Sequence, residues 1–280
     1  MKPCSEQVPL ARAGFTLVEL LVVVALVGLL ASMLAPTMAR TQPNSASFQC
    51  LNNLRQLAFA WKMYADDNNG RLVYNRDGAN TGKSSGSEAW VGGWLDYTSS
   101  SDNTNTALLI DHSRYPYSAF LGPYVRTPRI FKCPADRSTV PIAGERKPRV
   151  RSVSLNNQVG TGSRTWVTPS RYPLCTNFSQ IKSPVYMFVF LDEREDSIND
   201  GSFLTDSDTP YQVIDFPASY HNNAGGFSFA DGHTEIHHWK DPRTMPVLLP
   251  GQFLPLNVNL PGDVDALWLA QHAAGIASLP

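Results

Sequence analysis

Four acidic residues in one short stretch are the first candidates for chemistry. The run at residues 192–201 contains Asp192, Glu193, Asp196 and Asp200. Calcium takes about six to eight oxygen ligands, which a carboxylate-rich loop can supply. The spacing departs from the EF-hand pattern, because Ile198 stands where that pattern requires an oxygen ligand. The run therefore predicts either a calcium site or an acidic loop that is simply solvated.

A second candidate group is rich in histidine and lies at residues 221–238. It consists of His221, Asp231, His233, His237 and His238. Imidazole and carboxylate groups bind zinc, but no HExxH or comparable ligand spacing is present. Because side chains alternate along a strand, His233, Glu235 and His237 are expected on one face and Thr234, Ile236 and His238 on the other. The pattern leaves open a zinc site or a structural role in which His221 hydrogen-bonds a hairpin.

Cysteine, nucleophile and charge patterns narrow the chemistry. The cysteines are Cys4, Cys50, Cys133 and Cys175, and none forms a CxxC pair, so a zinc ribbon is not indicated. The sequence has no Walker A or GxGxxG pattern and no convincing nucleophile, so we predict that the chain is not an enzyme. The formal net charge of -1 gives no electrostatic reason to expect a nucleic-acid partner.

The elements that must position these residues are short strands between many turns. Hydrophobic residues make up 42% of the chain and charged residues 17%, which is enough for a folded core. Residues 185–191 (VYMFVFL) are continuous and apolar and predict a central strand. Residues 226–239 alternate on either side of Asp231-Gly232, which predicts a hairpin with a tight turn.

A helix is predicted before this region. Apolar residues spaced by three and four predict an amphipathic helix over residues 45–69; they are Phe48, Leu51, Leu54, Leu57, Ala58, Trp61 and Tyr64. Asn68-Asn69-Gly70 predicts its end.

The N-terminal segment at residues 15–35 is the most apolar part of the chain. Glu19 is its one charged residue. As a helix it would be about 31 Å long, which matches the hydrocarbon core of a bilayer. It is too long for a secretory signal core, and the sequence before Pro36 is a poor cleavage site. A simple signal anchor leaves Glu19 unexplained, because a charge within a membrane costs several kcal/mol.

The residues around the start of this segment resemble the processing site of type IV prepilins. Gly14 takes the last position of the leader, Phe15 the first of the mature chain and Glu19 the fifth. The resemblance implies cleavage after Gly14 by a prepilin peptidase and methyltransferase, and methylation of the new Phe15 amine. Glu19 would neutralise that amine on a neighbouring subunit. Pro36 takes the position where pilins commonly carry a helix-loosening proline.

The rest of the chain is similar to a large group of prepilin-like proteins prominent in Planctomycetes and Verrucomicrobia. His221 stands before Asp231 and Gly232 in the spacing of their His-x9-Asp-Gly segment. The stretches at residues 50–57, 131–134 and 191–193 also resemble that group. The resemblance implies a disulfide between Cys50 and Cys133, with Cys175 free. Calcium binding in the heads of related pseudopilins favours a calcium site here, but no cofactor is required.

These observations predict a pilin-like α+β fold, with a long N-terminal helix packed on an antiparallel sheet and large loop insertions. The predicted parts are a cytoplasmic leader (1–14), a transmembrane assembly helix (15–36), its amphipathic continuation (37–69) and an exported β-rich head (70–280). The implied function is a structural one, as a minor pilin or pseudopilin of a pilus-like or type II secretion filament. Its partners would be other subunits and the inner membrane. The alternative is an exported glycan-binding or metal-dependent enzymatic domain, for which Trp90 and Trp94 are a candidate aromatic patch.

Overall fold

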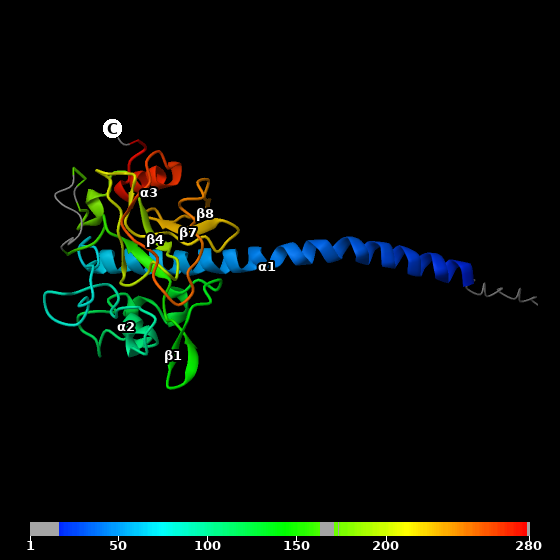
Figure 1. Cartoon of the computed structure of the whole chain (residues 1–280), viewed down its shortest axis with the longest axis horizontal. Helices are drawn as coiled ribbons and strands as arrows, with labels where there is room; N and C mark the ends of the chain where they lie inside the picture. The colour runs from blue at the N-terminus through cyan, green and yellow to red at the C-terminus, as the bar shows by residue number, and fades with distance from the viewer. Residues whose placement is uncertain (1–16, 163–170, 173, 279–280) are drawn as a thin grey trace, which may run out of the picture. The chain divides into compact units, whose positions relative to one another are not determined.

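The computed structural model describes the backbone of residues 17–162, 171–172 and 174–278, and the side chains of the same residues except 31–45 (Figure 1). The chain divides into two compact units, Met1–Gln42 and Pro43–Pro280. The second unit is called the head below. It contains the sheet, the loop insertions and the C-terminal part of the first helix.

Helix α1 (Leu17–Asp67) is the longest element of the structure. Within the head, Cys50, Leu54, Leu57 and Trp61 recur at intervals of three and four and are buried, whereas Phe48 of the predicted apolar stripe is 73% exposed. The helix ends where Asn69 (φ 56°) and Gly70 (φ 79°) turn the backbone into the left-handed region. The Gly70 amide then donates to the Ala65 carbonyl over 2.7 Å, which satisfies one of the last carbonyls of the helix. The predicted stop is confirmed.

A five-stranded sheet forms the centre of the head. Its strands stand in the order β5-β3-β4-β7-β8 and are antiparallel except for the parallel pair β3–β5. They are β3 (Val153–Asn156), β4 (Phe188–Asp192), β5 (Ser202–Phe203), β7 (Ala224–Phe229) and β8 (Thr234–His238). Strands β3, β4 and β7 are buried along their full length. The predicted central strand is confirmed as β4.

Strand β4 begins later than the apolar run predicts. Val185 and Tyr186 are 52% and 43% exposed and precede the strand. Pro184 starts this stretch, and the amides of Tyr186 and Met187 both donate to the Ser183 carbonyl, which closes a turn instead of extending the sheet ladder. The turn therefore removes three residues from the predicted strand.

The predicted hairpin is formed by β7 and β8. Gly232 has a φ of 97°, and of the Asp-Gly pair it alone takes a positive value. The Phe229 amide donates to the His233 carbonyl over 3.0 Å and closes the turn. The Asp231 carboxylate accepts from the His233 amide over 3.0 Å. Asp231 thus shapes the turn through its side chain, and Gly232 through its backbone.

Two helices cover opposite faces of the sheet (Figure 1). On one face, residues of α1 pack with Val153, Leu155, Val189 and Phe190. On the other, α3 (Val264–Ala274) packs Leu269 and Ala273 against the aromatic residues Phe188, Phe203, Phe227 and Phe229. Strand β7 approaches α1 closely at Gly226, where an added Cβ would lie 2.9 Å from a methyl carbon of Leu54. The α+β architecture is confirmed.

Short elements interrupt long loops around this centre. They are η1 (Ser101–Asn103), α2 (Ala107–Ile110), η2 (Gly122–Tyr124), η3 (Pro128–Phe131), the hairpin β1 (Thr139–Ile142) and β2 (Glu145–Pro148), η4 (Phe178–Gln180), and the pair β6 (Gln212–Val213) and β9 (Val258–Asn259). Within these insertions Trp90 is fully buried, stacks on Phe131 and donates to the Gly201 carbonyl. Trp90 is therefore a core residue and is not accessible to the ligand that the candidate patch with Trp94 would bind.

Candidate functional site

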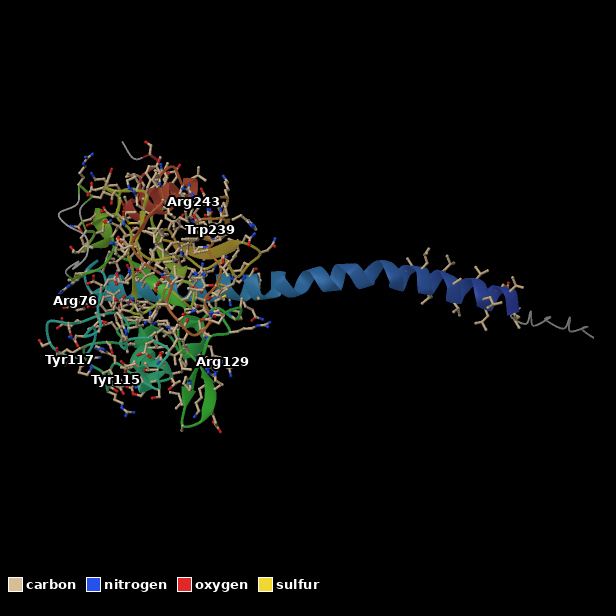
Figure 2. All side chains as sticks on the ribbon, viewed as in Figure 1. Arg76, Tyr115, Tyr117, Arg129, Trp239 and Arg243 are labelled. Carbon is tan, nitrogen blue, oxygen red and sulfur yellow. The ribbon has the colours of Figure 1, made fainter. Side chains whose placement is uncertain are left out.

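The start of helix α1 carries apolar side chains on every side. Within residues 17–30 the large apolar side chains are between 48% (Val23) and 73% (Leu17) exposed, and they stand out from the helix (Figure 2). Glu19 lies in the first turn, where a carboxylate interacts favourably with the helix dipole. Gly14 and Phe15 lie outside the described residues, as does the side chain of Pro36.

Among the residues that the structure describes, no helix combines the length and the apolar character needed to cross a membrane.

A cluster of four metal-ligating side chains lies inside the head. Cys50 belongs to α1, Cys133 follows η3, Asp192 ends β4, and His221 lies in the loop before β7. All four are buried, with exposed fractions of 1%, 1%, 0% and 4%. Among the described residues, this is the one group of three or more His, Cys, Asp or Glu side chains that could hold a metal ion.

The ligand atoms of this cluster face one another. The Cys50 Sγ lies 3.3 Å from Asp192 Oδ2, and the Cys133 Sγ lies 3.3 Å from His221 Nε2. His221 Nε2 lies 3.7 Å from Asp192 Oδ2. All four atoms are within 4.8 Å of one another. The cluster thus offers two sulfur atoms, one nitrogen and one oxygen around a single point.

Further hydrogen bonds with neighbouring residues orient these side chains. Ser47 Oγ lies 3.0 Å from His221 Nδ1, which leaves Nε2 facing the cluster. Ser152 Oγ donates to Asp192 Oδ1 over 2.7 Å and accepts from the Cys133 amide over 2.8 Å. The Ala135 amide donates to the Cys133 Sγ over 3.4 Å. Each of these bonds fixes the direction of a side chain that is already buried.

The protonation of the cluster follows from its burial and from its close pairs. The neighbouring Cys133 thiol, burial and the Asp192 carboxylate together raise the pKa of the Cys50 thiol well above its usual range. Burial acts to lower the pKa of His221, but its hydrogen bonds with Asp192 and Cys133 outweigh that effect and raise it to about 9. Without a metal ion, these effects favour the protonated forms of His221 and Cys50, and a metal that binds there has to displace those protons.

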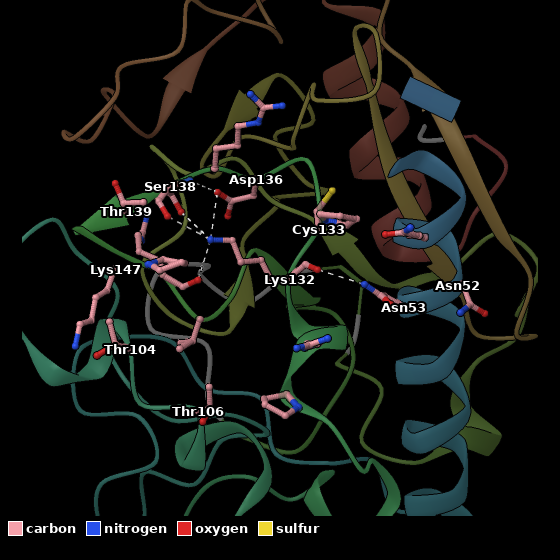
Figure 3. A pocket seen from close by; sticks show the side chains of 18 residues that line it. Asn52, Asn53, Thr104, Thr106, Lys132, Cys133, Asp136, Ser138, Thr139 and Lys147 are labelled. Carbon is pink, nitrogen blue, oxygen red and sulfur yellow. Dashed lines mark hydrogen bonds and ion pairs between the residues drawn. The ribbon is translucent and has the colours of Figure 1, made fainter. Parts of the chain in front are cut away.

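A pocket of about 850 Å³ lies beside the cluster, between the polar side of α1 and residues 128–150. Figure 3 shows Lys132 reaching across it toward Asp136 and Ser138. The Lys132 Nζ lies 3.6 Å from Asp136 Oδ1 and donates to the Arg149 carbonyl over 2.8 Å. The wall also contains Arg129 and Arg137, so it carries more cationic than anionic side chains.

Comparison with known families matches residues 10–35 to the prokaryotic N-terminal methylation motif. The matched range contains Gly14, Phe15 and Glu19. The match supports a type IV pilin-like protein. It also supports processing by a prepilin peptidase and attachment of an exported subunit to a membrane filament. No curated protein and no solved structure matches this pilin-like chain.

The two cysteines that the resemblance pairs are brought together by the fold. Cys50 and Cys133 belong to one cluster, and their sulfur atoms lie within 4.8 Å of each other. Both are free thiols in the structure, and so is the buried Cys175. The structure therefore places the predicted pair side by side without a bond between them.

The histidine-rich group does not gather into one site. His233 stacks on Phe229 at 4.2 Å, and His237 stacks on Trp268 of α3 at 3.7 Å. Burial lowers the pKa of His237 to about 4, so its ring is neutral and packs as an aromatic side chain. Thr234 faces α1 instead, where it accepts from Arg55 over 3.2 Å. Of these histidines, His221 alone joins the cluster, so the described hairpin residues do not form the zinc site that the pattern left open.

The acidic run is buried, and its carboxylates have separate partners. Asp192 belongs to the cluster. Glu193 accepts from Ser154 Oγ and Ser197 Oγ, Asp196 pairs with Arg194, and Asp200 accepts from the amides of Gly78 and Ser202. Burial raises the pKa of Glu193 to about 8 and that of Asp200 to about 6. The expectation of a solvated loop is wrong, and the four carboxylates do not share one site.

Sequence reasoning assigned every member of the cluster to another role. It paired the cysteines with each other, gave Asp192 to a calcium loop and grouped His221 with the hairpin. One signal was available. Cys50 lies on the buried face of a helix and Asp192 ends an apolar strand, so each polar group needs a buried partner.

Proposed function

We propose that this chain is a structural subunit of a type IV pilus-like or type II secretion filament, and more closely a minor pilin or pseudopilin. The observation that carries the proposal is the methylation motif at residues 10–35, with Gly14, Phe15 and Glu19 in the processing positions. A head of over 200 residues is large for a major subunit, which favours the minor one.

The proposed life of the subunit begins in the inner membrane. Residues 1–14 stay in the cytoplasm, residues 15–36 span the bilayer, and the head is exported to the periplasm or cell surface. Exposed apolar side chains on all sides of residues 17–30 support this, because such a helix is stable in lipid or against other apolar helices. The peptidase cleaves after Gly14, and the Phe15 amine is methylated.

Glu19 gives the assembly its register. Cleavage after Gly14 creates a cationic amine at Phe15, and a carboxylate in an apolar environment needs such a partner. Glu19 of one subunit neutralises the Phe15 amine of its neighbour, so subunits that are out of register leave two charges unpaired. Association of the apolar helices then builds the filament.

We assign the head a contact role and no catalysis. The four-residue cluster supports this, because its ligands are all buried, whereas catalytic metal sites keep a position open to substrate. We also infer that the chain belongs with the His-x9-Asp-Gly group. Both ends of the His-x9-Asp-Gly segment have defined structural roles in this chain, since His221 faces the cluster and Gly232 forms the turn after β7.

Intact mass of the membrane-extracted chain tests the processing step. We expect the loss of residues 1–14 and the gain of one methyl group. Gly14→Val should leave the leader attached, whereas Gly28→Ala should be processed normally, because nothing lies within 4 Å of a Cβ at Gly28. A wild-type chain that keeps its leader in the presence of the peptidase contradicts the proposal.

Filament assembly tests the role of Glu19. Glu19→Ala should be cleaved but should not enter filaments, because the Phe15 amine then has no partner. Glu145→Ala is the matched control, since Glu145 is an exposed carboxylate on β2 of the head. If Glu19→Ala assembles as well as Glu145→Ala, the register mechanism is wrong even where processing is confirmed.

A further inference from the structure

We propose that the buried cluster in the head is a structural zinc site. Its ligands are Cys50 Sγ, Cys133 Sγ, Asp192 Oδ2 and His221 Nε2. The inference concerns the head alone and does not depend on filament assembly.

The donor set favours zinc among common metal ions. Zinc binds thiolate, imidazole and carboxylate together, and its structural sites have four protein ligands. Calcium and magnesium prefer oxygen ligands alone, so Cys50 and Cys133 make them poor occupants. The full burial of the four side chains fits a closed structural site rather than one that exchanges ligands with solvent.

The distances fit a tetrahedral centre. With zinc bonds of about 2.3 Å to sulfur and about 2.0–2.1 Å to nitrogen and oxygen, tetrahedral ligand atoms lie roughly 3.3–3.8 Å apart. The measured separations are 3.3 Å for Cys50–Asp192, 3.3 Å for Cys133–His221 and 3.7 Å for His221–Asp192. Since no pair exceeds 4.8 Å, an ion at the centre needs only small side-chain movements.

The surrounding hydrogen bonds are those that metal ligands require. A zinc-binding histidine directs one nitrogen at the metal and engages the other in a hydrogen bond, as His221 does through Nδ1 to Ser47. The second oxygen of Asp192 is held by Ser152. The Ala135 amide donates to the Cys133 sulfur, which stabilises a thiolate.

A disulfide between Cys50 and Cys133 explains less of this arrangement. It would use two of the four side chains, and the burial of the His221–Asp192 pair beside it would have no explanation. It would also give no reason for Ser47 and Ser152 to orient that pair. Zinc uses all four ligands and both serines.

The ion would fasten α1 to the sheet. Its ligands come from α1, the segment after η3, the end of β4 and the loop before β7, which are far apart in sequence. Gly226 of β7 lies beside the same point, because an added Cβ there would be 3.0 Å from the Cys50 Sγ. One zinc ion thus links four segments where the helix meets the sheet, and it adds binding free energy to folding.

Metal analysis of the untagged full-length chain in detergent tests the proposal. We expect one zinc ion per wild-type chain. The zinc content of Cys133→Ser and of His221→Gln should be at least about tenfold lower. Cys175→Ser is the matched control, because Cys175 is also buried but lies outside the cluster. Zinc that survives in both cluster variants would overturn the assignment.

A second measurement remains decisive if the cluster variants do not fold. Wild-type chain is stripped with a chelator under reducing conditions and then titrated with Co²⁺. We expect the intense visible bands of tetrahedral cobalt and a thiolate charge-transfer band, with Ser47→Ala binding about 10–100-fold more weakly. A wild-type chain that shows neither band overturns the proposal. A disulfide would also overturn the proposal. Its sign would be a chain isolated without reductant that contains no metal, is two hydrogens lighter than expected and regains them with dithiothreitol.

Discussion

The two described parts of helix α1 present opposite surfaces although both are rich in apolar residues. In residues 17–30 the large apolar side chains are exposed on every side, whereas in the head Leu54, Leu57 and Trp61 are at most 1% exposed. The first part has no polar face, whereas the second has one buried apolar stripe and an outer side that carries most of its polar residues. The same secondary structure therefore presents two kinds of surface, one apolar on every side and one with a buried apolar stripe and a mainly polar outer side.

The two parts of the helix therefore differ in how much packing within the chain stabilises them. The head part buries its apolar stripe against the sheet, so its packing contributes to the stability of the head. The large apolar side chains of residues 17–30 are exposed instead, so each should contribute little to the stability of the head. Substitutions in the two parts should therefore affect different measurements.

The largest expected difference is between two leucines of the one helix. Leu57→Ala should lower the free energy of unfolding of the head by about 2–5 kcal/mol, because Leu57 is 0% exposed and leaves a cavity. Leu26 is 54% exposed, so Leu26→Ala should change it by less than about 0.5 kcal/mol. Urea unfolding of the full chain in detergent, followed by tryptophan fluorescence, measures both. Equal losses would show that the two parts are not energetically separate.

The stability of the head should also depend on pH, because the head contains buried titratable groups that an apolar segment lacks. Burial raises the pKa of Asp200 to about 6, against hydrogen bonds from Gly78 and Ser202 and the charge of Arg151, which lower it. The native head then binds a proton that the unfolded chain releases near the ordinary aspartate pKa of 3.8. This contribution is complete below pH 3.8 and is lost as the pH rises through about 6. It amounts to at most about 3 kcal/mol.

Asp200→Asn tests that dependence. The amide does not titrate, so the variant should lose less stability than the wild type between pH of about 4.5 and about 7.5. Asp241→Asn serves as the control, because Asp241 is a surface carboxylate beside Arg243. Urea unfolding at a series of pH values gives both slopes. A wild-type head whose stability rises over this range would contradict the assignment.

Two glycines extend the comparison to backbone approach. An added Cβ at Gly226 would lie 2.9 Å from Leu54 Cδ1 and 3.0 Å from Cys50 Sγ, so Gly226→Ala should push α1 from the sheet. We expect a loss of about 1–3 kcal/mol. Nothing lies within 4 Å of a Cβ at Gly28, so Gly28→Ala should leave the stability of the head unchanged. Equal thermal midpoints for the two variants would show that β7 does not limit the approach of α1.

Local patterns predicted the elements of this fold well. The end of α1 followed from Asn68–Gly70, the hairpin from Asp231-Gly232, and strand β4 from one apolar run. In each case neighbouring residues contain the whole signal, through backbone preference or alternation. Strand β4 was too long in the prediction because the turn at Ser183 outweighs the apolar character of Val185 and Tyr186.

The cluster could not be predicted in the same way. Cys50, Cys133, Asp192 and His221 have no common spacing, and each lies in a different element. Their meeting depends on the order of β3, β4 and β7 and on the face that α1 covers, which local sequence does not specify. The acidic run was misjudged for a related reason, because distant groups satisfy some of its carboxylates: Ser154 donates to Glu193, and the Gly78 amide donates to Asp200.

The smallest expected effect concerns the exposed edge between α1 and the hairpin. Arg55 Nη2 donates to Thr234 Oγ1 on β8 over 3.2 Å, and water reaches both groups. A double-mutant cycle of Arg55→Ala and Thr234→Val should give a coupling below about 1 kcal/mol, because water replaces an exposed hydrogen bond at little cost. A control cycle with Thr209→Val should give none, since the Thr209 hydroxyl donates to Asp206. A larger coupling at Thr234 would mean that the surface contact, as well as the buried stripe, determines where the head part of α1 docks.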